Sequence, residues 1–181
     1  MKYKETLLVG ALVAAATGQA HAFPCFGTSM ITCNPWQQSV QDDAYFQTGG
    51  RAKHKDAATG VIQVFCPVFN TTGQNRFSSD SENTWNDLIV TYKDPDGPGT
   101  QYRVTASLRY VDTSGRVKTV ATVDSNEQFN APLTDTTMQT RISGHTFDFL
   151  HRHYYLQVGI NREDTEAAPD VAGFNICGRI F

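Results

Sequence analysis

Three histidines that lie close together in the sequence are candidates for holding a metal ion. His151 and His153 are two positions apart, so on a strand both imidazoles would lie on one face. His145 is near enough along the chain to supply a third ligand, and imidazole nitrogens bind zinc and copper. The alternative is that His151 and His153 decorate a solvent-facing strand surface and bind nothing, and we favour that interpretation.

A second chemical candidate is the polar segment around Trp85. Asn83, Asn86 and Asp87 flank this tryptophan, and an indole ring beside amides and a carboxylate is an arrangement that can hold a sugar ring. The alternative is that Trp85 packs in the core, since it stands just before the apolar run 88–90. The two interpretations exclude each other, and a tryptophan in this position belongs more often to the packing.

No motif in the sequence selects a catalytic residue. A Gly-x-Ser-x-Gly nucleophile elbow does not occur in the sequence, and carboxylate pairs for glycoside hydrolysis are recognised by their separation in space rather than in sequence. The sequence therefore favours binding over catalysis, and nothing in it requires a cofactor.

The four cysteines are expected to form disulfides. We predict the pairs Cys25–Cys33 and Cys66–Cys177, of which the first would enclose a turn and the second would tie an early strand to the last one. A thiolate metal site is the competing interpretation, but the sequence contains no Cys-x-x-Cys.

The first 22 residues have the features of a cleaved signal peptide. Lys2 and Lys4 form a basic start, residues 7–16 are mostly apolar, and residues 20–22 (Ala-His-Ala) fit a signal peptidase site. The apolar stretch is too short for a comfortable bilayer crossing. We therefore expect residues 1–22 to be removed and residues 23–181 to form a single domain in an oxidising compartment, periplasmic or extracellular.

The rest of the chain shows the alternation of apolar and polar residues that is typical of β-strands. Clusters of Gly, Pro, Asn and Asp separate these segments, as at 94–99 and 112–115. The expected strands cover residues 61–69, 88–93, 102–110, 116–124, 138–142, 150–160 and 174–180. With about eight short strands, the pattern predicts an all-β fold, an antiparallel two-sheet sandwich or jelly roll.

Several of these features occur together in one known group of proteins. A mature start near a cysteine, the Phe-Gln-Thr-Gly stretch at 46–49, Cys66-Pro67 within a strand and a last-strand cysteine resemble a diffuse group of small secreted proteobacterial single-domain proteins of uncharacterised function. The resemblance covers roughly residues 45–181 and implies a β-sandwich outside the cytoplasm. It supplies no catalytic or binding residues.

Composition narrows the classes of partner. The chain is 40% hydrophobic and 18% charged with a formal charge of −3, which argues against disorder and against holding a phosphate backbone, so nucleic acid is not an expected partner. No membrane span is expected. We predict a secreted or periplasmic non-catalytic binding module for carbohydrate or another surface component. The alternatives are a structural subunit of an extracellular assembly, joined through edge strands, and a metal-dependent protein that uses the histidine strand.

Overall fold

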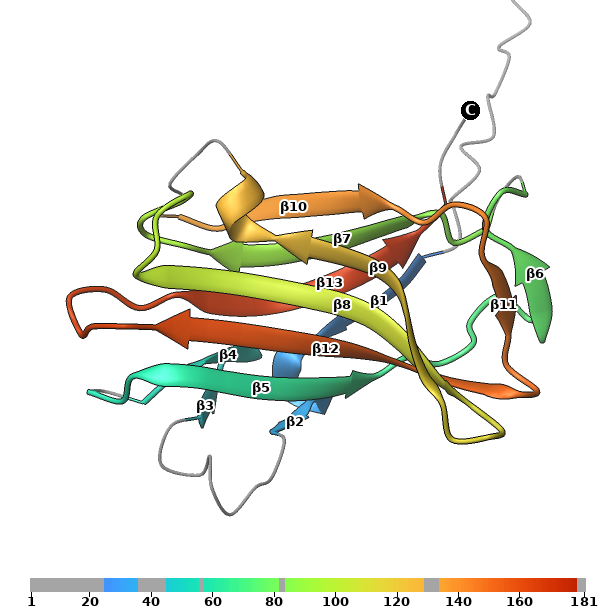
Figure 1. Ribbon diagram of the computed structural model, residues 1–181, viewed down its shortest axis with the longest axis horizontal. Helices are drawn as coiled ribbons and strands as arrows, with labels where there is room; N and C mark the ends of the chain where they lie inside the picture. The colour runs from blue at the N-terminus through green and yellow to red at the C-terminus, as the bar shows by residue number, and fades with distance from the viewer. Residues whose placement is uncertain (1–24, 36–44, 56, 82–83, 129–133, 179–181) are drawn as a thin grey trace, which may run out of the picture.

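The protein folds as an antiparallel β-sandwich. A computed structural model describes residues 25–35, 45–55, 57–81, 84–128 and 134–178 (Figure 1). The predicted signal peptide lies outside the described residues. The two-sheet sandwich predicted from the alternation is confirmed.

One sheet, here called sheet I, has five strands, all antiparallel, and faces the viewer in Figure 1. Its order is β2 (Asn34–Pro35), β5 (Gly60–Pro67), β12 (Arg152–Arg162), β8 (Tyr102–Asp112) and β9 (Val117–Asp124). The two longest strands, β8 and β12, pair along their whole length, from Tyr102 opposite Arg162 to Asp112 opposite Arg152. Of these two, β12 is the central strand of the sheet.

The other sheet, sheet II, has six strands, with the last strand of the chain at its centre. Its order is β10 (Thr136–Arg141), β7 (Asp87–Lys93), β13 (Asp170–Cys177), β4 (Arg51–His54) and β3 (Tyr45–Thr48), and β1 (Cys25–Ser29) also pairs with β13. A small end sheet of β6 (Arg76–Ser78) and β11 (Thr146–Asp148) lies at one end of the sandwich (Figure 1). Two single turns of 3₁₀-helix, η1 (Met30–Thr32) and η2 (Ser125–Glu127), complete the described elements. None of the described segments forms a helix with the length and apolar character needed to cross a bilayer.

The core lies between the two sheets because every second residue of each long strand points inward. On β8 and β12 the alternate buried residues begin at Tyr102 and Tyr154, and their neighbours point to the outer face. Sheet II contributes the inward residues of β7 and β13. The largest fully buried side chains of the two sheets are Ile62, Leu108, Leu156, Ile160, Leu88, Tyr92, Met138 and Phe174.

The predicted disulfide pairing is wrong, although all four cysteines are disulfide-bonded. The bonds join Cys25 to Cys177 and Cys33 to Cys66. Residues 25–29 are a strand rather than a turn, and this strand lies beside β13 with Cys25 directly opposite Cys177. Cys66 points into the core from sheet I, whereas Cys177 follows the buried Ile176 on sheet II and points the other way, so these two sulfurs do not face each other. The first strand is thereby tied to the last.

Candidate functional site

Trp85 is a core residue and offers no surface to a sugar. Its side chain is 0% exposed and lies within an aromatic cluster under the end sheet, with ring centroids 5.6 Å from Phe77, 5.5 Å from Phe147 and 5.8 Å from Phe26. The polar residues that follow are buried as well, since Asn86 is 1% and Asp87 4% exposed. The proposed sugar site at Trp85, Asn86 and Asp87 is therefore wrong, because the packing interpretation applies. Asn83 lies outside the described residues.

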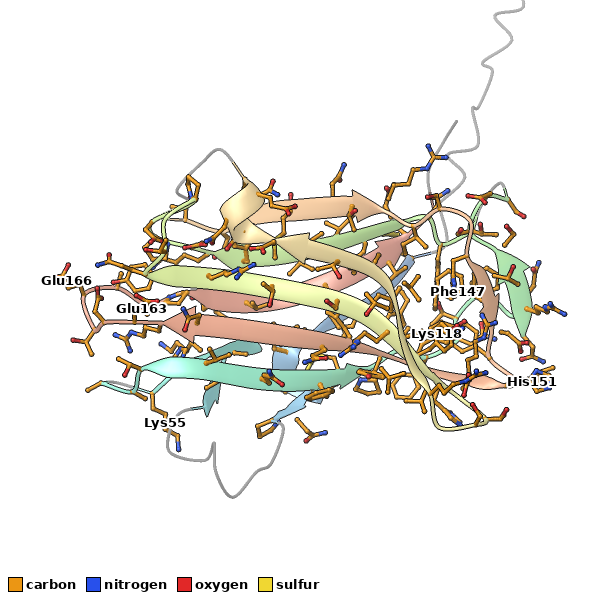
Figure 2. The ribbon with its side chains drawn as sticks, in the orientation of Figure 1. Lys55, Lys118, Phe147, His151, Glu163 and Glu166 are labelled. Carbon is orange, nitrogen blue, oxygen red and sulfur yellow. A yellow bond between two sulfur atoms is a disulfide. The ribbon has the colours of Figure 1, made fainter. Side chains whose placement is uncertain are left out.

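The three histidines do not come together. His151 lies at the end of the molecule, where Figure 2 shows it beyond the strands, and its Nδ1 is 3.0 Å from the Asp148 carboxylate. His153 is exposed on β12. His145 is turned inward, with Nε2 3.0 Å from the Tyr154 hydroxyl. No group of three or more His, Cys, Asp or Glu within the described ranges could hold a metal ion, so the predicted site at His145, His151 and His153 is not formed.

His145 packs against an aromatic ring and stays neutral. The imidazole packs edge-on against the Phe147 ring, with centroids 4.8 Å apart. Burial, and after it the positive charge of Arg152, lowers the pKa of His145 from 6.5 to about 4. His145 is thus a neutral packing residue near pH 7.

A groove of about 730 Å³ on the outer face of sheet I is the best candidate for a binding site. Three neighbouring strands form its floor, and the hairpin between β8 and β9 supplies one wall. The lining residues are Gln63, Phe65, Arg109, Val111, Gly115, Val117, Tyr155 and Gln157. This mixture of apolar surface and a few converging polar groups is the usual character of a small-molecule site.

Two aromatic side chains form the apolar part of the floor. Phe65 on β5 and Tyr155 on β12 are each partly exposed, and their ring centroids are 5.7 Å apart with an interplanar angle of 34°. Gln157, two residues from Tyr155, lies directly opposite Phe65, so the two rings are diagonal cross-strand neighbours. Together they present one broad apolar surface to solvent.

A chain of polar side chains crosses the same floor. Arg109 Nη1 on β8 donates a hydrogen bond of 2.5 Å to Gln157 Oε1 on β12. Gln157 Nε2 in turn donates to Gln63 Oε1 on β5 at 3.2 Å. Because each amide has a defined partner, the orientation of these groups is fixed before any ligand arrives.

The Asp112 carboxylate stabilises the hairpin wall, in addition to the backbone hydrogen bonds of the hairpin itself. Asp112 Oδ1 accepts hydrogen bonds from the backbone N–H of Ser114 at 2.9 Å and of Arg116 at 3.0 Å. The Ser114 hydroxyl donates to the same oxygen, and this hydrogen bond is the main reason that the pKa of Asp112 falls from 3.8 to about 2.

The shape of the hairpin also depends on an irregularity in its strands. The strand register shifts between Leu108 and Arg109, which places a bulge in β9, and a bulge bends and twists a hairpin. Gly115 at the tip has φ of +80°, which a side chain rarely tolerates.

A smaller hollow continues along the same face. It has a volume of about 220 Å³ and is lined by Val61, Arg103, Thr105, Gly159 and Asn161. Gly159 lies on β12 two residues beyond Gln157, and a Cβ there would approach the Thr105 hydroxyl to 2.8 Å. Because Gly159 has no side chain, the surface of the sheet is open at this position and the hollow can form there. From Tyr155 to Asn161 the two hollows follow about 20 Å of β12.

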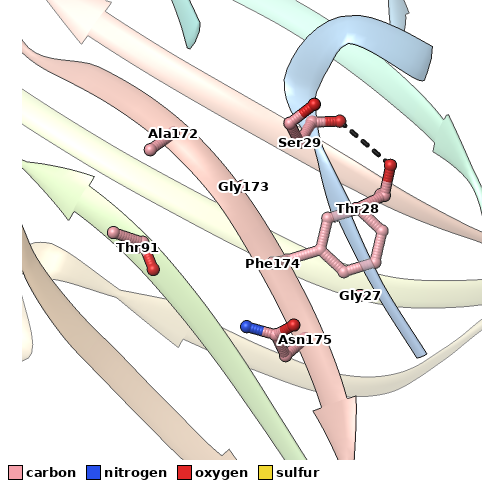
Figure 3. A pocket seen from close by; sticks show the side chains of 8 residues that line it. All are labelled: Gly27, Thr28, Ser29, Thr91, Ala172, Gly173, Phe174 and Asn175. Atoms are coloured by element: carbon pink, nitrogen blue, oxygen red, sulfur yellow. Dashed lines mark hydrogen bonds between the residues drawn. The ribbon is translucent and has the colours of Figure 1, made fainter. Parts of the chain in front are cut away.

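Sheet II also carries a hollow on its surface, shown in Figure 3, but it has a different character. Its volume is about 440 Å³ and its lining includes Gly27, Thr28, Thr91, Gly173 and Asn175. Phe174, which belongs to the same lining, is only 1% exposed, so no aromatic face is available there. The hollow lies where β13 is irregular between Val171 and Gly173. It offers backbone and hydroxyl groups without an apolar platform.

The groove was not predicted from the sequence. Its lining residues face outward from their strands, whereas the alternation was used to predict the residues that face the core. Phe65 and Tyr155 each stand at a position where the alternation calls for a polar side chain. Two large aromatic residues on the solvent side of half-buried strands are a signal that could have been noticed.

Comparison with known proteins places the fold but not the activity. No protein-family model matches the sequence, and no curated protein matches it. Among solved structures, a xylan-binding module of family CBM15 is similar, with a TM-score of 0.51, 12% identity and coverage of 87% of this chain and 97% of that one. A xylan-binding domain of family CBM22 has a TM-score of 0.41 at 11% identity, covering 93% of each chain. At 12% identity the first likeness concerns the sandwich fold alone.

Proposed function

We propose that the protein is a non-catalytic carbohydrate-binding module that holds a polysaccharide chain in the groove on the outer face of sheet I. The observation that carries this proposal is the pair formed by Phe65 and Tyr155. The C–H face of a pyranose ring packs well against an aromatic face, and an aromatic surface that is already in place orders no further side chain on binding.

The other groups of the groove fit the same ligand. Hydroxyl groups of a sugar both donate and accept hydrogen bonds, and the Gln63 and Gln157 amides offer both functions beside the aromatic rings. The smaller hollow at Gly159 extends the face along β12, which suits a linear polymer better than a single small molecule. None of the eight residues that line the groove has a carboxyl group, so the lining lacks the acid and base of a glycoside hydrolase.

The comparison adds a first choice of ligand. One similar solved structure is a xylan-binding module. Xylan is therefore the first polysaccharide to test with this chain. Export to the periplasm or to the medium, as the N-terminal sequence indicates, would bring the protein to such polymers.

Affinity electrophoresis of the purified protein through gels that contain soluble polysaccharides tests the proposal. Xylan, mixed-linkage β-glucan and a galactan form the panel, and a gel without polysaccharide gives the reference mobility. Retardation by at least one polysaccharide, lost in the double variant Phe65→Ala/Tyr155→Ala, is the expected result. A Leu150→Ala variant is the matched control, because Leu150 is 66% exposed and lies outside the groove. Equal mobility of the wild-type protein in all gels would refute binding of these three polysaccharides, and carbohydrate binding as a whole is refuted if charged polysaccharides do not bind either.

A further inference from the structure

The groove contains a guanidinium group that no described carboxylate neutralises. Of the eight residues that line the groove, only Arg109 has a formal charge near neutral pH. The side chain is partly buried, its Nη1 bonds the neutral amide of Gln157, and its Nε is buried without a hydrogen-bond partner. A half-desolvated cation with a neutral partner is in an unfavourable environment until an anion arrives.

Three other arginines of the described chain each pair with a carboxylate, whereas Arg152 and Arg162 donate to backbone carbonyl groups. Arg51 pairs with Asp135 and Asp170, Arg103 pairs with Asp124, and Arg116 pairs with Asp112. Within the described residues, no carboxylate lies within ion-pair distance of Arg109. The chain as a whole is acidic, with a formal charge of −3, so this local positive charge does not reflect a generally basic surface.

Arg109 lies next to the aromatic platform, which is the pair of rings of Phe65 and Tyr155. Arg109 on β8 lies directly opposite Tyr155 on β12 in the strand register. The Gln157 amide holds Nη1 from one side, and Gln157 is itself held by Gln63. A negatively charged substituent on a sugar that stacks on Tyr155 would therefore lie within reach of the guanidinium group.

We propose that the groove selects acidic glycans, with Arg109 recognising the carboxylate of a uronic acid residue. This inference rests on the proposed carbohydrate-binding function and specifies its substrate class. A guanidinium group presents parallel N–H donors that match the two oxygens of a carboxylate, and charge-assisted hydrogen bonds of this kind are about twice as strong as neutral ones. A carboxylate is favoured over a sulfate ester because the planar fork matches it.

The test compares polymers that differ only in charge. The probes are a xylan that carries glucuronic acid side groups, a polygalacturonate, and the product of carboxyl reduction of each, in which every uronic acid has become the neutral sugar. Titration calorimetry on the full chain should give at least about tenfold tighter binding for the acidic member of a pair. The preference should shrink as salt is raised from about 0.01 to 0.5 M.

Two variants separate recognition by Arg109 from a general charge effect. Arg109→Gln should bind the acidic and reduced polymers equally, because the preference for the acidic polymer is lost with the guanidinium group. Arg109→Lys, which keeps the charge but not the fork, should retain a smaller preference that depends on salt. Lys118→Gln is the matched control, since Lys118 is an exposed cation of β9 that does not line the groove, and it should keep the full preference.

The outcomes that overturn the inference are distinct from those that overturn the proposed function. Equal affinity of the wild-type protein for both members of each pair refutes acidic selection and leaves carbohydrate binding standing. A loss in Arg109→Gln of both affinities by the same factor assigns Arg109 a structural role and also refutes the inference. Preference for dextran sulfate over both carboxylated polymers refutes recognition of a carboxylate. Binding to none of the four polymers refutes the inference, while the neutral panel decides the function separately.

Discussion

Phe65 and Tyr155, on adjacent strands of sheet I, lie on the solvent side of the sheet with ring centroids 5.7 Å apart. The same strands place Ile62, Val64, Leu156 and Val158 in the core. Because core and platform are alternate residues of β5 and β12, the packing that stabilises the sandwich also fixes the spacing of the two rings. The platform is thus formed by regular strands rather than by loops.

Removal of one ring should weaken binding without unfolding the protein. In Tyr155→Ala, we expect the affinity for the polysaccharide that binds best to fall roughly 10- to 30-fold, since an aromatic anchor at an interface is worth about 2 kcal/mol. Titration calorimetry measures the affinity, and thermal unfolding checks the fold. Unchanged affinity in a folded Tyr155→Ala protein would show that the ring of Tyr155 does not contact the bound polysaccharide.

The hairpin wall should depend on Asp112. Asp112→Ala removes the acceptor of the Ser114 and Arg116 N–H groups, so the tip that carries Gly115 must be ordered on binding at a cost of about 1 kcal/mol, or about fivefold in affinity. The matched control is Asp148→Ala. Asp148 accepts N–H groups of Leu150 and His151 in another turn, away from the groove lining, and its loss should leave the affinity unchanged. Equal effects of the two substitutions would show that the hairpin has no special role.

Trp85 should matter for stability and not for affinity. Trp85→Ala leaves a cavity among Phe77, Phe147 and Phe26, and we expect a loss of about 3–5 kcal/mol in the free energy of unfolding, measured by urea denaturation. Phe69→Ala, at a residue that is 60% exposed, should cost less than about 1 kcal/mol. If the Trp85 variant keeps wild-type stability but loses binding, the core assignment is wrong.

The buried His145 predicts a stability that depends on pH. The unfolded chain takes up a proton on this residue near pH 6.5, whereas the folded protein does so only near pH 4. Between pH 4 and 6.5 the unfolded state binds more protons than the folded state, so the free energy of unfolding should fall as the pH is lowered through this range. Above pH 6.5, His145 is neutral in both states and should not affect the free energy of unfolding.

The comparison must be made against His145→Gln. Burial raises the pKa of Asp94 from 3.8 to about 6, which gives the opposite slope in the same pH range, but this contribution is present in both proteins and cancels. Urea denaturation at several pH values between 4 and 7 should show wild-type protein losing stability relative to the variant as pH falls. A difference that does not change with pH would mean that His145 titrates normally.

The long strands could be predicted from the sequence because each repeats its pattern many times. Eleven residues of alternation in β8 and in β12 leave no ambiguity about which side faces the core. Three-residue strands such as β6 and β11 are too short to show a period and were missed. The polar neighbours of Trp85 suggested a surface site, but Asn86 and Asp87 are buried where the strand β7 begins.

The disulfides and the groove depended on which strands are neighbours in space. Cys25 finds Cys177 only because β1 pairs with β13, and that pairing joins residues 152 positions apart. Likewise Phe65, Arg109 and Tyr155 become one site only through the order β5-β12-β8. The order of strands in a sheet cannot be predicted from the local sequence pattern of each strand.

The location of the groove is the central claim, and mapping a bound sugar on the protein by NMR tests it most directly. A titration of ¹⁵N-labelled protein with an oligosaccharide cut from the best-binding polysaccharide should shift the backbone amides of Phe65, Arg109, Tyr155 and Gln157 and leave the Trp85 indole N–H unchanged. Shifts confined to residues 27–29 and 172–175, which line the hollow on sheet II, would contradict the account.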